Sequence, residues 1–452
     1  MTYDLRGITR LLWPVLLEQS FAVFISMLST MMVSGVGPAA VAGVGLVGTI
    51  NAILTTTFIA VASGTTIIVS QRLGADRREE AGQSAAQSIT LAAYIGLGIG
   101  GLMMILADPL LSSLFPGAEP AVLSNAKLYL TFSSLSLPLQ ALFSTMAGIM
   151  RAAGNVRLPM LGSVMTDTAY ILIAWPAISL MNLGVAGAGW GLVASRLVPV
   201  IFLSLSLMRG HGGLYLPRIS PKLSGKILRP VLQVAIPTGL DSLMFNGGKL
   251  IVQVFLAGMG TAALAANSIC SSLVGFVNLP GGSMQVIAVT VVGRIYGAKR
   301  FGDVRKFALG FTLAATAMQT ILSLIMWPLL GTGISLYQPT QESLELSRSV
   351  MGLLLVTTPL FWAVSFVAPS GLRASGDVKF TMWVSVCSMF ILRVFGSWFF
   401  GVYLGMGLEG IWLSMSVDWV GRGLFFLPRI LSHKKRLLAK HAPPPEALPE
   451  AT

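Results

Sequence analysis

Twelve apolar segments of about 20 residues each follow one another along this chain, and they limit its possible folds more than any other feature. A helix of that length crosses roughly 30 Å of hydrocarbon, and it satisfies its backbone hydrogen bonds without water. Only 10% of the residues are charged and 54% are hydrophobic, whereas soluble domains carry roughly 25% charged residues. The sequence therefore predicts an all-α integral membrane protein with twelve transmembrane helices. The segments lie near residues 12–34, 46–69, 86–107, 126–149, 159–181, 186–208, 232–256, 271–292, 307–330, 350–370, 381–403 and 408–430.

Lys and Arg gather in alternate connections between these segments, and the other connections are almost free of basic residues, with Arg348 as the main exception. Because basic loops stay in the cytoplasm, the alternation predicts a protein of the cell membrane with both termini in the cytoplasm. The net charge of +13 does not indicate nucleic-acid binding, which needs basic residues gathered on a folded soluble face. The basic connections contain Arg6 and Arg10; Arg72, Arg77 and Arg78; Arg151 and Arg157; the run from Arg209 to Arg229; the run from Arg294 to Lys306; Arg373 and Lys379; and the cluster from Lys434 to Lys440.

The pattern from Pro14 to Ala75 returns without a gap from Pro237 to Ala298, and the matches mark prolines, glycines and a buried acid. A second matched pair of stretches runs from Arg151 to Arg157 and from Arg373 to Lys379. A same-direction repeat with an even number of membrane spans makes a parallel pair related by an axis along the membrane normal. We therefore expect two pseudo-symmetric six-helix bundles. The predicted parts are an N-terminal bundle (1–208), a basic cytoplasmic linker (209–230), a C-terminal bundle (231–432) and a disordered cytoplasmic tail (433–452).

Five short motifs occur in the same order as in a known transporter family. They are Val33-Ser34-Gly35-Val36-Gly37, Val69-Ser70-Gln71-Arg72-Leu73-Gly74-Ala75, Val292-Gly293-Arg294-Ile295-Tyr296-Gly297-Ala298, Leu372-Arg373-Ala374-Ser375-Gly376-Asp377 and the stretch from Gly407 to Trp412. On twelve apolar segments, this order resembles the MATE family of multidrug and toxic compound extrusion transporters. The resemblance implies two six-helix bundles around a central cavity and alternating access. It also implies export of organic, often cationic, compounds in exchange for protons or sodium ions.

Ionisable side chains inside the spans are few, and such groups usually face a cavity or a partner, because burying them in hydrocarbon is costly. Glu18 and Asp241 are the strongest candidates, since each follows a helix proline by four residues at matched positions of the repeat. A proline removes a backbone hydrogen bond and opens the helix nearby, so an acid beside it can bind a cation or exchange a proton. Alternatively, these carboxylates cap the freed backbone groups or meet a neighbouring helix. Together with Asp167 in the fifth span, they are the candidate sites for a coupling proton or sodium ion.

Basic side chains inside the spans have two possible roles, in the cavity or at the membrane surface. Lys249 follows Asp241 by eight residues, about 12 Å along a helix axis, so the two are not expected to pair directly. Lys249 either extends to the membrane interface or lines the cavity of the C-terminal half, with Asn246 one turn before it. Arg151 and Arg373 lie at helix ends next to glycine turns, and we interpret them as anchors at the inner face rather than as substrate contacts.

The remaining buried charges are expected to form structural ion pairs. Arg393 and Asp418 fall near the midplane on adjacent antiparallel helices, and Arg422, one turn from Asp418, is a competing partner. Asp167 and Arg196 are expected to pair in a similar way in the N-terminal half. Such pairs would hold each bundle together.

The chain departs from the family where the resemblance implies coupling sites. In one branch of the family, an Asp in the first helix and an Asn and an Asp in the fifth form a cation site, and these positions are Ser29, Tyr170 and Ala174 here. In another branch a Glu in the seventh helix serves the C-terminal half, and Phe245, next to Asn246, takes its place here. We therefore expect Ser29, Tyr170, Phe245 and Asn246 to line the substrate cavity and the displaced acids to carry the coupling.

Other site classes find no support in the sequence. Cys270 and Cys387 lie far apart in apolar stretches, and the three histidines lie in connections or in the tail, so no disulfide, metal site or cofactor is expected. Motifs such as GxSxG and HExxH and a complete phosphate-binding loop are absent, so neither an enzyme nor an ATP-driven pump is expected.

The expected function is a secondary active exporter of a small amphipathic organic molecule, working in the lipid bilayer as a monomer without a nucleic-acid partner. The first alternative is a flippase for a lipid-linked sugar or a similar amphiphile, built on a related fold. Such a flippase would need inward-facing basic residues to bind phosphate. A second alternative, from a different class, is a non-transporting intramembrane enzyme or receptor.

Overall fold

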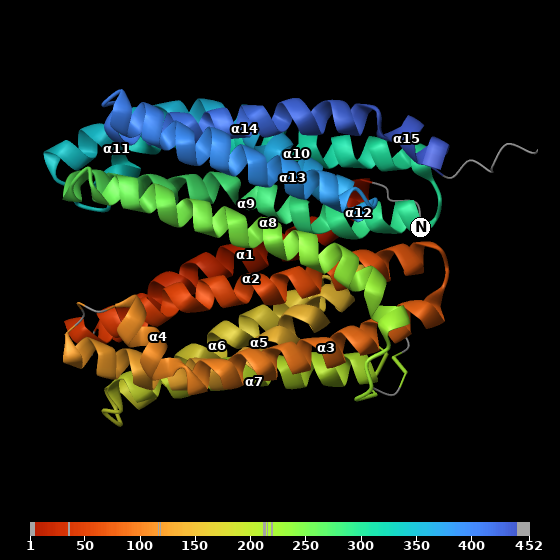
Figure 1. The fold of residues 1–452 in the computed structure, drawn as a ribbon, viewed down its shortest axis with the longest axis horizontal. Helices are drawn as coiled ribbons and strands as arrows, with labels where there is room; N and C mark the ends of the chain where they lie inside the picture. The colour runs from red at the N-terminus through yellow and green to blue at the C-terminus, as the bar shows by residue number, and fades with distance from the viewer. Residues whose placement is uncertain are drawn as a thin grey trace, which may run out of the picture.

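The computed structural model describes residues 5–34, 37–115, 117, 119–210, 214, 216–217 and 220–440, and nearly all of these residues form helices (Figure 1). The first half contains α1 (Leu5–Ser34), α2 (Pro38–Gly74), α3 (Arg78–Ile105), α4 (Ala107–Leu114), α5 (Pro120–Ala152), α6 (Arg157–Ser179) and α7 (Gly184–Met208). The second half contains α8 (Gly225–Ala257), α9 (Thr261–Gly297), α10 (Phe301–Ser335), α11 (Gln341–Thr357), α12 (Ala363–Ala374), α13 (Val378–Ser388), α14 (Gly407–Leu431) and α15 (His433–Lys440), with π-helical segments η1 (Thr358–Trp362), η2 (Met389–Val394) and η3 (Ser397–Tyr403).

Each half makes six membrane crossings within the described residues. They are α1, α2, α3, α5, α6 and α7 in the first half, and α8, α9, α10, the continuous run α11–η1–α12, the continuous run α13–η2–η3 and α14 in the second. Eight of the described helices are long and apolar enough to cross a membrane by length and composition alone. The predicted all-α fold with twelve crossings is therefore confirmed, and the halves form two separate layers in Figure 1.

The backbone repeats its unusual turns at matched positions of the two halves. Gly37 and Gly260 precede α2 and α9 with φ angles of 128° and 96°. Gly154 and Gly376 follow α5 and α12 with φ angles of 88° and 92°. Because only glycine adopts positive φ angles at little cost, these residues fix where the chain turns between helices. The repeat in the sequence thus corresponds to a repeat in backbone geometry, while the predicted domain boundaries stay a prediction.

The two halves touch most closely where α2 and α9 end. A Cβ atom added at Gly74 would lie 2.0 Å from the carbonyl oxygen of Arg294, and one added at Gly297 would lie 1.8 Å from that of Gln71. Glycine is therefore required at both positions, because any side chain would push the backbones apart.

Hydrogen bonds cross between the halves at the same level. Gln71 Nε2 in α2 donates to the carbonyl oxygen of Ala374 at 2.8 Å. Arg294 Nη2 in α9 donates to the carbonyl oxygen of Ala152 at 2.6 Å. These donors satisfy helix-end carbonyls that lack a partner within their own helix. This double contact lies at the end of the molecule that the charge pattern places in the cytoplasm.

The chain after residue 432 is more ordered than predicted. His433–Lys440 form α15, so the prediction of a disordered tail is wrong for these residues, while 441–452 lie outside the described part. The physical reason is burial: Leu437 packs into an apolar cluster formed mostly by the second half, and His433 Nε2 hydrogen-bonds with Ser375 Oγ at 2.7 Å. The predicted linker is also shorter than expected, since α8 already begins at Gly225.

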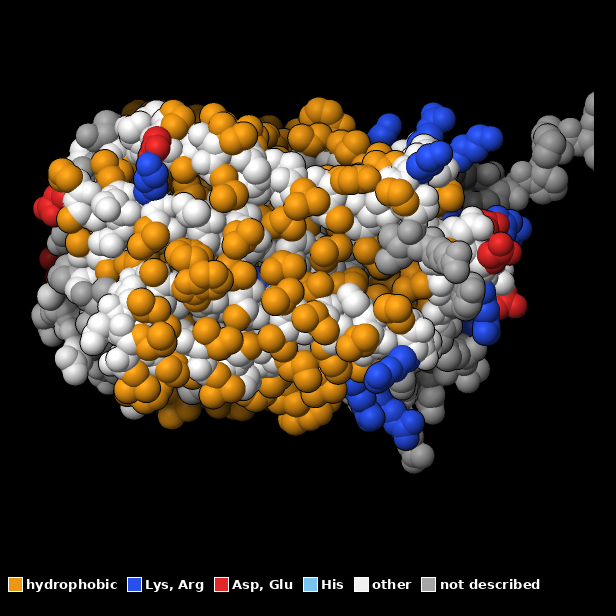
Figure 2. Space-filling model, turned by 90° about the horizontal axis from the view of Figure 1, so that it is seen from below, with side chains coloured by type: hydrophobic (Ala, Val, Ile, Leu, Met, Phe, Trp, Pro, Cys, Tyr) orange, Lys and Arg blue, Asp and Glu red, His pale blue; other side chains and the backbone are white. Residues whose placement is uncertain are grey.

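The surface has the character of a membrane protein. Figure 2 shows hydrophobic side chains across the middle of one face, with most of its Lys and Arg side chains grouped at one end. Large apolar side chains such as Ile105, Leu172 and Val254 are exposed, as expected for a multi-pass integral membrane protein whose helices face lipid.

Candidate functional site

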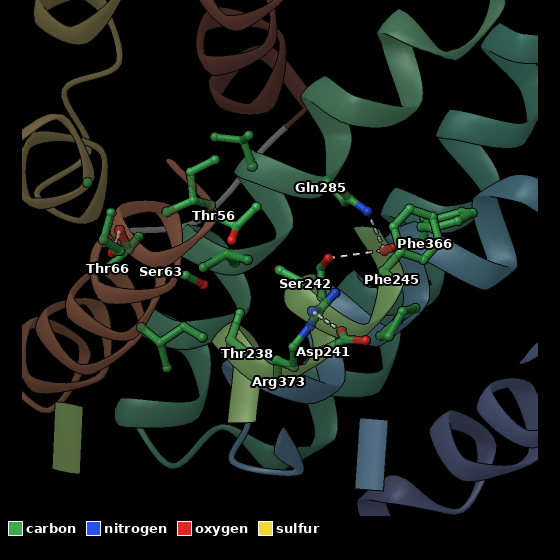
Figure 3. A pocket seen from close by; sticks show the side chains of 18 of the residues that line it. Thr56, Ser63, Thr66, Thr238, Asp241, Ser242, Phe245, Gln285, Phe366 and Arg373 are labelled. Carbon is green, nitrogen blue, oxygen red and sulfur yellow. Dashed lines mark hydrogen bonds and ion pairs between the residues drawn. The ribbon is translucent and has the colours of Figure 1, made fainter. Parts of the chain in front are cut away.

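A cavity of about 530 Å³ lies between the two halves. In the first half its walls come from α2 and α5, and in the second from α8, α9, α12, α13 and α14. Hydroxyl groups of Thr56, Ser63 and Thr66 mark the α2 wall, opposite the side chains of α8 (Figure 3). The charged residues in the described lining are Arg151 from the first half and Asp241, Arg373 and Arg422 from the second. The electrostatics of the cavity are therefore set mainly by the C-terminal half.

Asp241 and Arg373 face each other across the cavity wall (Figure 3), with Arg373 Nη1 3.2 Å from Asp241 Oδ2. Their side chains are 15% and 19% exposed, so the pair is largely removed from lipid but open to the cavity. Pro237 lies one turn before Asp241 inside α8, as the sequence indicated. The interpretation of Arg373 as an anchor at the inner face rather than a substrate contact stays a prediction, and its side chain lines the cavity.

Glu18 and Arg151 form the counterpart of this pair in the first half. Arg151 Nη1 lies 3.2 Å from Glu18 Oε1, and Ser163 Oγ donates to the same oxygen at 3.0 Å. Arg151 lines the cavity, and its interpretation as an anchor likewise stays a prediction, whereas the cavity lining does not include Glu18. Sequence reasoning missed both pairings, although the acids and the arginines each occupied matched positions of the repeat.

A buried ion triad joins α14 to α13 and η2. Asp418, whose side chain is 0% exposed, lies 3.6 Å from Arg393 Nε and 2.9 Å from Arg422 Nε. It also accepts a hydrogen bond from Ser388 Oγ. Both partners expected for Asp418 are thus present, and Arg422, the competing one, is the closer.

Phe245 and Asn246 lie in the cavity wall, as expected for α8. The Phe245 ring meets Phe366 edge to face, with centroids 6.1 Å apart, and Asn246 Nδ2 donates to the carbonyl oxygen of Ser242 at 2.9 Å. Lys249 Nζ lies 4.9 Å from the centre of the Phe245 ring. A residue that sequence reasoning missed, Gln285 of α9, also lines the cavity and donates to the carbonyl oxygen of Phe366 at 2.7 Å.

The N-terminal candidates lie away from this cavity. Asp167 and Arg196 form no salt bridge, and Arg196 Nη1 instead donates to Gln140 Oε1. The prediction of an ion pair there is therefore wrong, because the guanidinium of Arg196 donates to the amide oxygen of Gln140 instead. Tyr170 is buried, and the described lining contains none of these three residues. The backbone of Ser29 belongs to α1, but its side chain lies outside the described part.

Comparison with known proteins agrees with the geometry. The family model MatE matches residues 14–175 and again residues 237–399, together more than half of the chain. The uncharacterized transporter YisQ of Bacillus subtilis is 27% identical over 457 residues, which cover 95% of this chain and 94% of that protein. The probable multidrug resistance protein NorM of Thermotoga maritima is 26% identical over 388 residues, covering 82% and 80%. A solved structure of MATE in the bent conformation superimposes with a TM-score of 0.87 at 20% identity, over 95% of this chain and 96% of its own.

Proposed function

The chain belongs to the MATE family, whose model matches both of its halves, and from this premise we propose that it is a secondary active antiporter of the cell membrane. It exports amphipathic organic compounds by alternating access, in exchange for protons or sodium ions. A relative named as a probable multidrug resistance protein supports a small organic substrate. The cavity between two repeat-related bundles is where transporters of this architecture bind their substrates.

The pairing of Asp241 with Arg373 inside the cavity carries this proposal. A charged carboxylate attracts the guanidinium, and this attraction disappears when the carboxylate takes up a proton. Proton uptake by Asp241 therefore frees Arg373 to move or to bind another group in the same cavity. The protonation state of Asp241 would then decide whether Arg373 is held in the wall or is available to the substrate, which links proton binding to substrate binding.

The same contact favours a proton over a sodium ion. A proton needs only the carboxylate, whereas hard cations such as Ca²⁺ and Mg²⁺ are held by several oxygen ligands, and we extend that requirement to Na⁺. The nearest charged group to Asp241 is the N–H donor of Arg373 at 3.2 Å, which repels any metal cation. We therefore expect a pH gradient to drive transport and a sodium gradient to be weaker.

Purified protein reconstituted in vesicles tests the proposal. Efflux of one cationic and one anionic amphipathic dye is followed under an imposed pH gradient and, separately, under a sodium gradient. We expect the parent to move at least one dye when the pH gradient is applied. Asp241→Asn, which keeps the shape of the side chain, should abolish the response to the gradient, and Glu18→Gln should reduce it.

Asp108→Asn is the matched control. Asp108 is an exposed carboxylate, paired with Lys127 at 2.7 Å outside the cavity, and an exposed pair contributes only about 0–1 kcal/mol. Its transport should equal that of the parent. If neither gradient moves either dye, antiport is the wrong function, and if Asp241→Asn and Glu18→Gln both behave like the parent, the coupling site lies elsewhere.

A flippase for a lipid-linked sugar or a similar amphiphile is the second candidate, favoured by the three arginines in the cavity lining. Such a protein would move a fluorescent lipid-linked phosphate between leaflets, and soluble dyes would stay in place. The same vesicles distinguish the two functions when the labelled lipid is quenched from outside.

A further inference from the structure

The cavity region of the C-terminal half holds more positive than negative charge. Within the described residues, this region contains two carboxylates, Asp241 and Asp418, and four cations, Arg373, Arg393, Arg422 and Lys249. Asp241 pairs with Arg373, whereas Asp418 serves both Arg393 and Arg422. Lys249 forms no salt bridge with a described residue, so two positive charges remain without a carboxylate of their own. Unbalanced charge at membrane depth is expensive and is characteristic of a site for ligands or ions.

These surplus charges meet at one aromatic ring. The centre of the Phe245 ring lies 4.9 Å from Lys249 Nζ, 5.3 Å from Arg393 Cζ and 5.4 Å from Arg422 Cζ. A ring face attracts one cation by its quadrupole, but it cannot neutralise several. Because Phe245 and Arg422 both line the cavity, the surplus charge borders space that a ligand can enter.

Lys249 faces this interior and does not face lipid. The exposed apolar side chains of α8 include Ile236, Leu240, Ile251 and Val254. At about 100° of rotation per residue they form one stripe along the helix, and Lys249 lies on the opposite side. Its side chain is exposed and lies against the ring of Phe245, which lines the cavity.

Hydrogen-bond donors also remain available in the wall. A guanidinium has five N–H groups, and the described residues give Arg373 one bond, from Nη1 to Asp241. Planar forks of this kind bind carboxylate, phosphate and sulfonate groups with two donors at once.

We propose that the C-terminal wall of the cavity binds the anionic headgroup of an amphiphile. Arg422 and Arg373 in the lining contact the headgroup, and Lys249, beside the Phe245 ring, adds positive charge. The apolar part of the ligand lies against Phe245 and Phe366. This inference rests on the proposed transport function and names its substrate class, an organic anion with an apolar body. It departs from the cationic compounds that the family resemblance implies, and the reason is the charge of this chain's own cavity.

Binding to the protein in nanodiscs of zwitterionic lipid tests the inference without any gradient. The probes are two molecules with the same pyrene ring and alkyl arm, one ending in a sulfonate and the other in a trimethylammonium group. We expect the sulfonate probe to bind at least about tenfold more tightly. Lys249→Gln should weaken binding of the sulfonate probe by about tenfold and leave binding of the ammonium probe unchanged.

A double variant, Asp241→Asn with Arg373→Gln, removes the wall pair without leaving an unpaired charge, and it should also weaken the sulfonate probe. Lys127→Gln, an exposed lysine outside the cavity, should change neither probe. Tighter binding of the ammonium probe, or sulfonate binding that both cavity variants leave intact, would overturn the inference. Because binding is measured at equilibrium and without a gradient, the binding test can contradict this inference while vesicle transport still supports the proposed function. The opposite combination of results is equally possible.

Phosphatidylglycerol added to the nanodiscs then distinguishes two sources of the anion. If the natural ligand is a bilayer lipid, this anionic lipid displaces the sulfonate probe. If the ligand is a water-borne organic anion, the probe stays bound. Either result keeps the anionic headgroup as the recognised chemistry.

Discussion

Gln71 and Arg294 occupy matched positions of the repeat, and each donates a hydrogen bond to the opposite half, at 2.8 Å and 2.6 Å respectively. Gly297 packs directly against the backbone of Gln71, and Gly74 packs against the backbone of Arg294. Together these contacts close the end of the molecule where the basic connections gather. In the proposed alternating-access cycle this symmetrical contact would break once in every turnover, which makes it a suitable place to perturb the cycle.

Gly297→Ala should destabilise the protein and slow transport. The new methyl group would lie 1.8 Å from the carbonyl oxygen of Gln71, so α9 must move away from α2. We expect a loss of about 1–3 kcal/mol, typical of overpacking, measured as thermal unfolding in detergent. Gly310→Ala in α10 is the control, because its Cβ would meet nothing within 4 Å. Equal unfolding temperatures for the two variants would show that this close contact between the halves does not contribute to stability.

Arg294→Ala should open the predicted cytoplasmic end. It removes the donors to Ala152, and a charge-assisted bond of this kind contributes roughly 1.5–3 kcal/mol. In a protein with Cys270→Ala and Cys387→Ala, a single reporter thiol introduced by Ser63→Cys lies in the cavity wall. We expect an impermeant thiol reagent added from the cytoplasmic side to label it faster in the Arg294→Ala background. Equal labelling rates would contradict the role of this contact as a barrier.

Asp418→Asn should be among the most destabilising single changes in the second half. The carboxylate is fully buried and neutralises both Arg393 and Arg422, and removing one partner of a buried ion pair costs about 3–5 kcal/mol. Asp377→Asn, whose pair with Arg429 is partly exposed, should cost less. Thermal unfolding of the two variants in the same detergent measures the difference, and an equal loss would show that Asp418 is not the main neutralising group.

Glu18 and Arg151 should show strong coupling in a double-mutant cycle. Each single change, Glu18→Gln or Arg151→Gln, leaves a partly buried charge without its partner, while the double variant leaves none. We expect the double variant to be more stable than the sum of the single losses predicts, with a coupling free energy of about 1–3 kcal/mol. Additive losses would mean that Ser163, not Arg151, is the main partner of Glu18.

The fold could be predicted from the sequence because few structures are compatible with a bilayer. Backbone groups in hydrocarbon must be paired within the helix, so segment length and the alternation of basic connections determine the twelve crossings. The ends of the helices were harder to predict, because α2 runs from Pro38 to Gly74 and so extends beyond its apolar part. The short α15 escaped prediction because its stability comes from packing of Leu437 against a distant core.

The candidate site could be predicted only in part. Asp241 was found because an acid beside a helix proline is locally visible in the sequence, and its position in the cavity agrees with that reasoning. Its partner Arg373 lies more than a hundred residues away, and sequence spacing says nothing about such a contact. The matched positions of Glu18 with Asp241 and of Arg151 with Arg373 were the available signal, because one pair in a repeat predicts the other.

The π-helical turns occur, within the described chain, only in the second half. A π turn holds one more residue than an α turn, so its conversion rotates the rest of the helix by about 100°. The segment η2 carries Arg393, and such a twist would carry this guanidinium to a new face. Such a conversion would let the second bundle change the side chains that it presents by rotating a helix about its own axis.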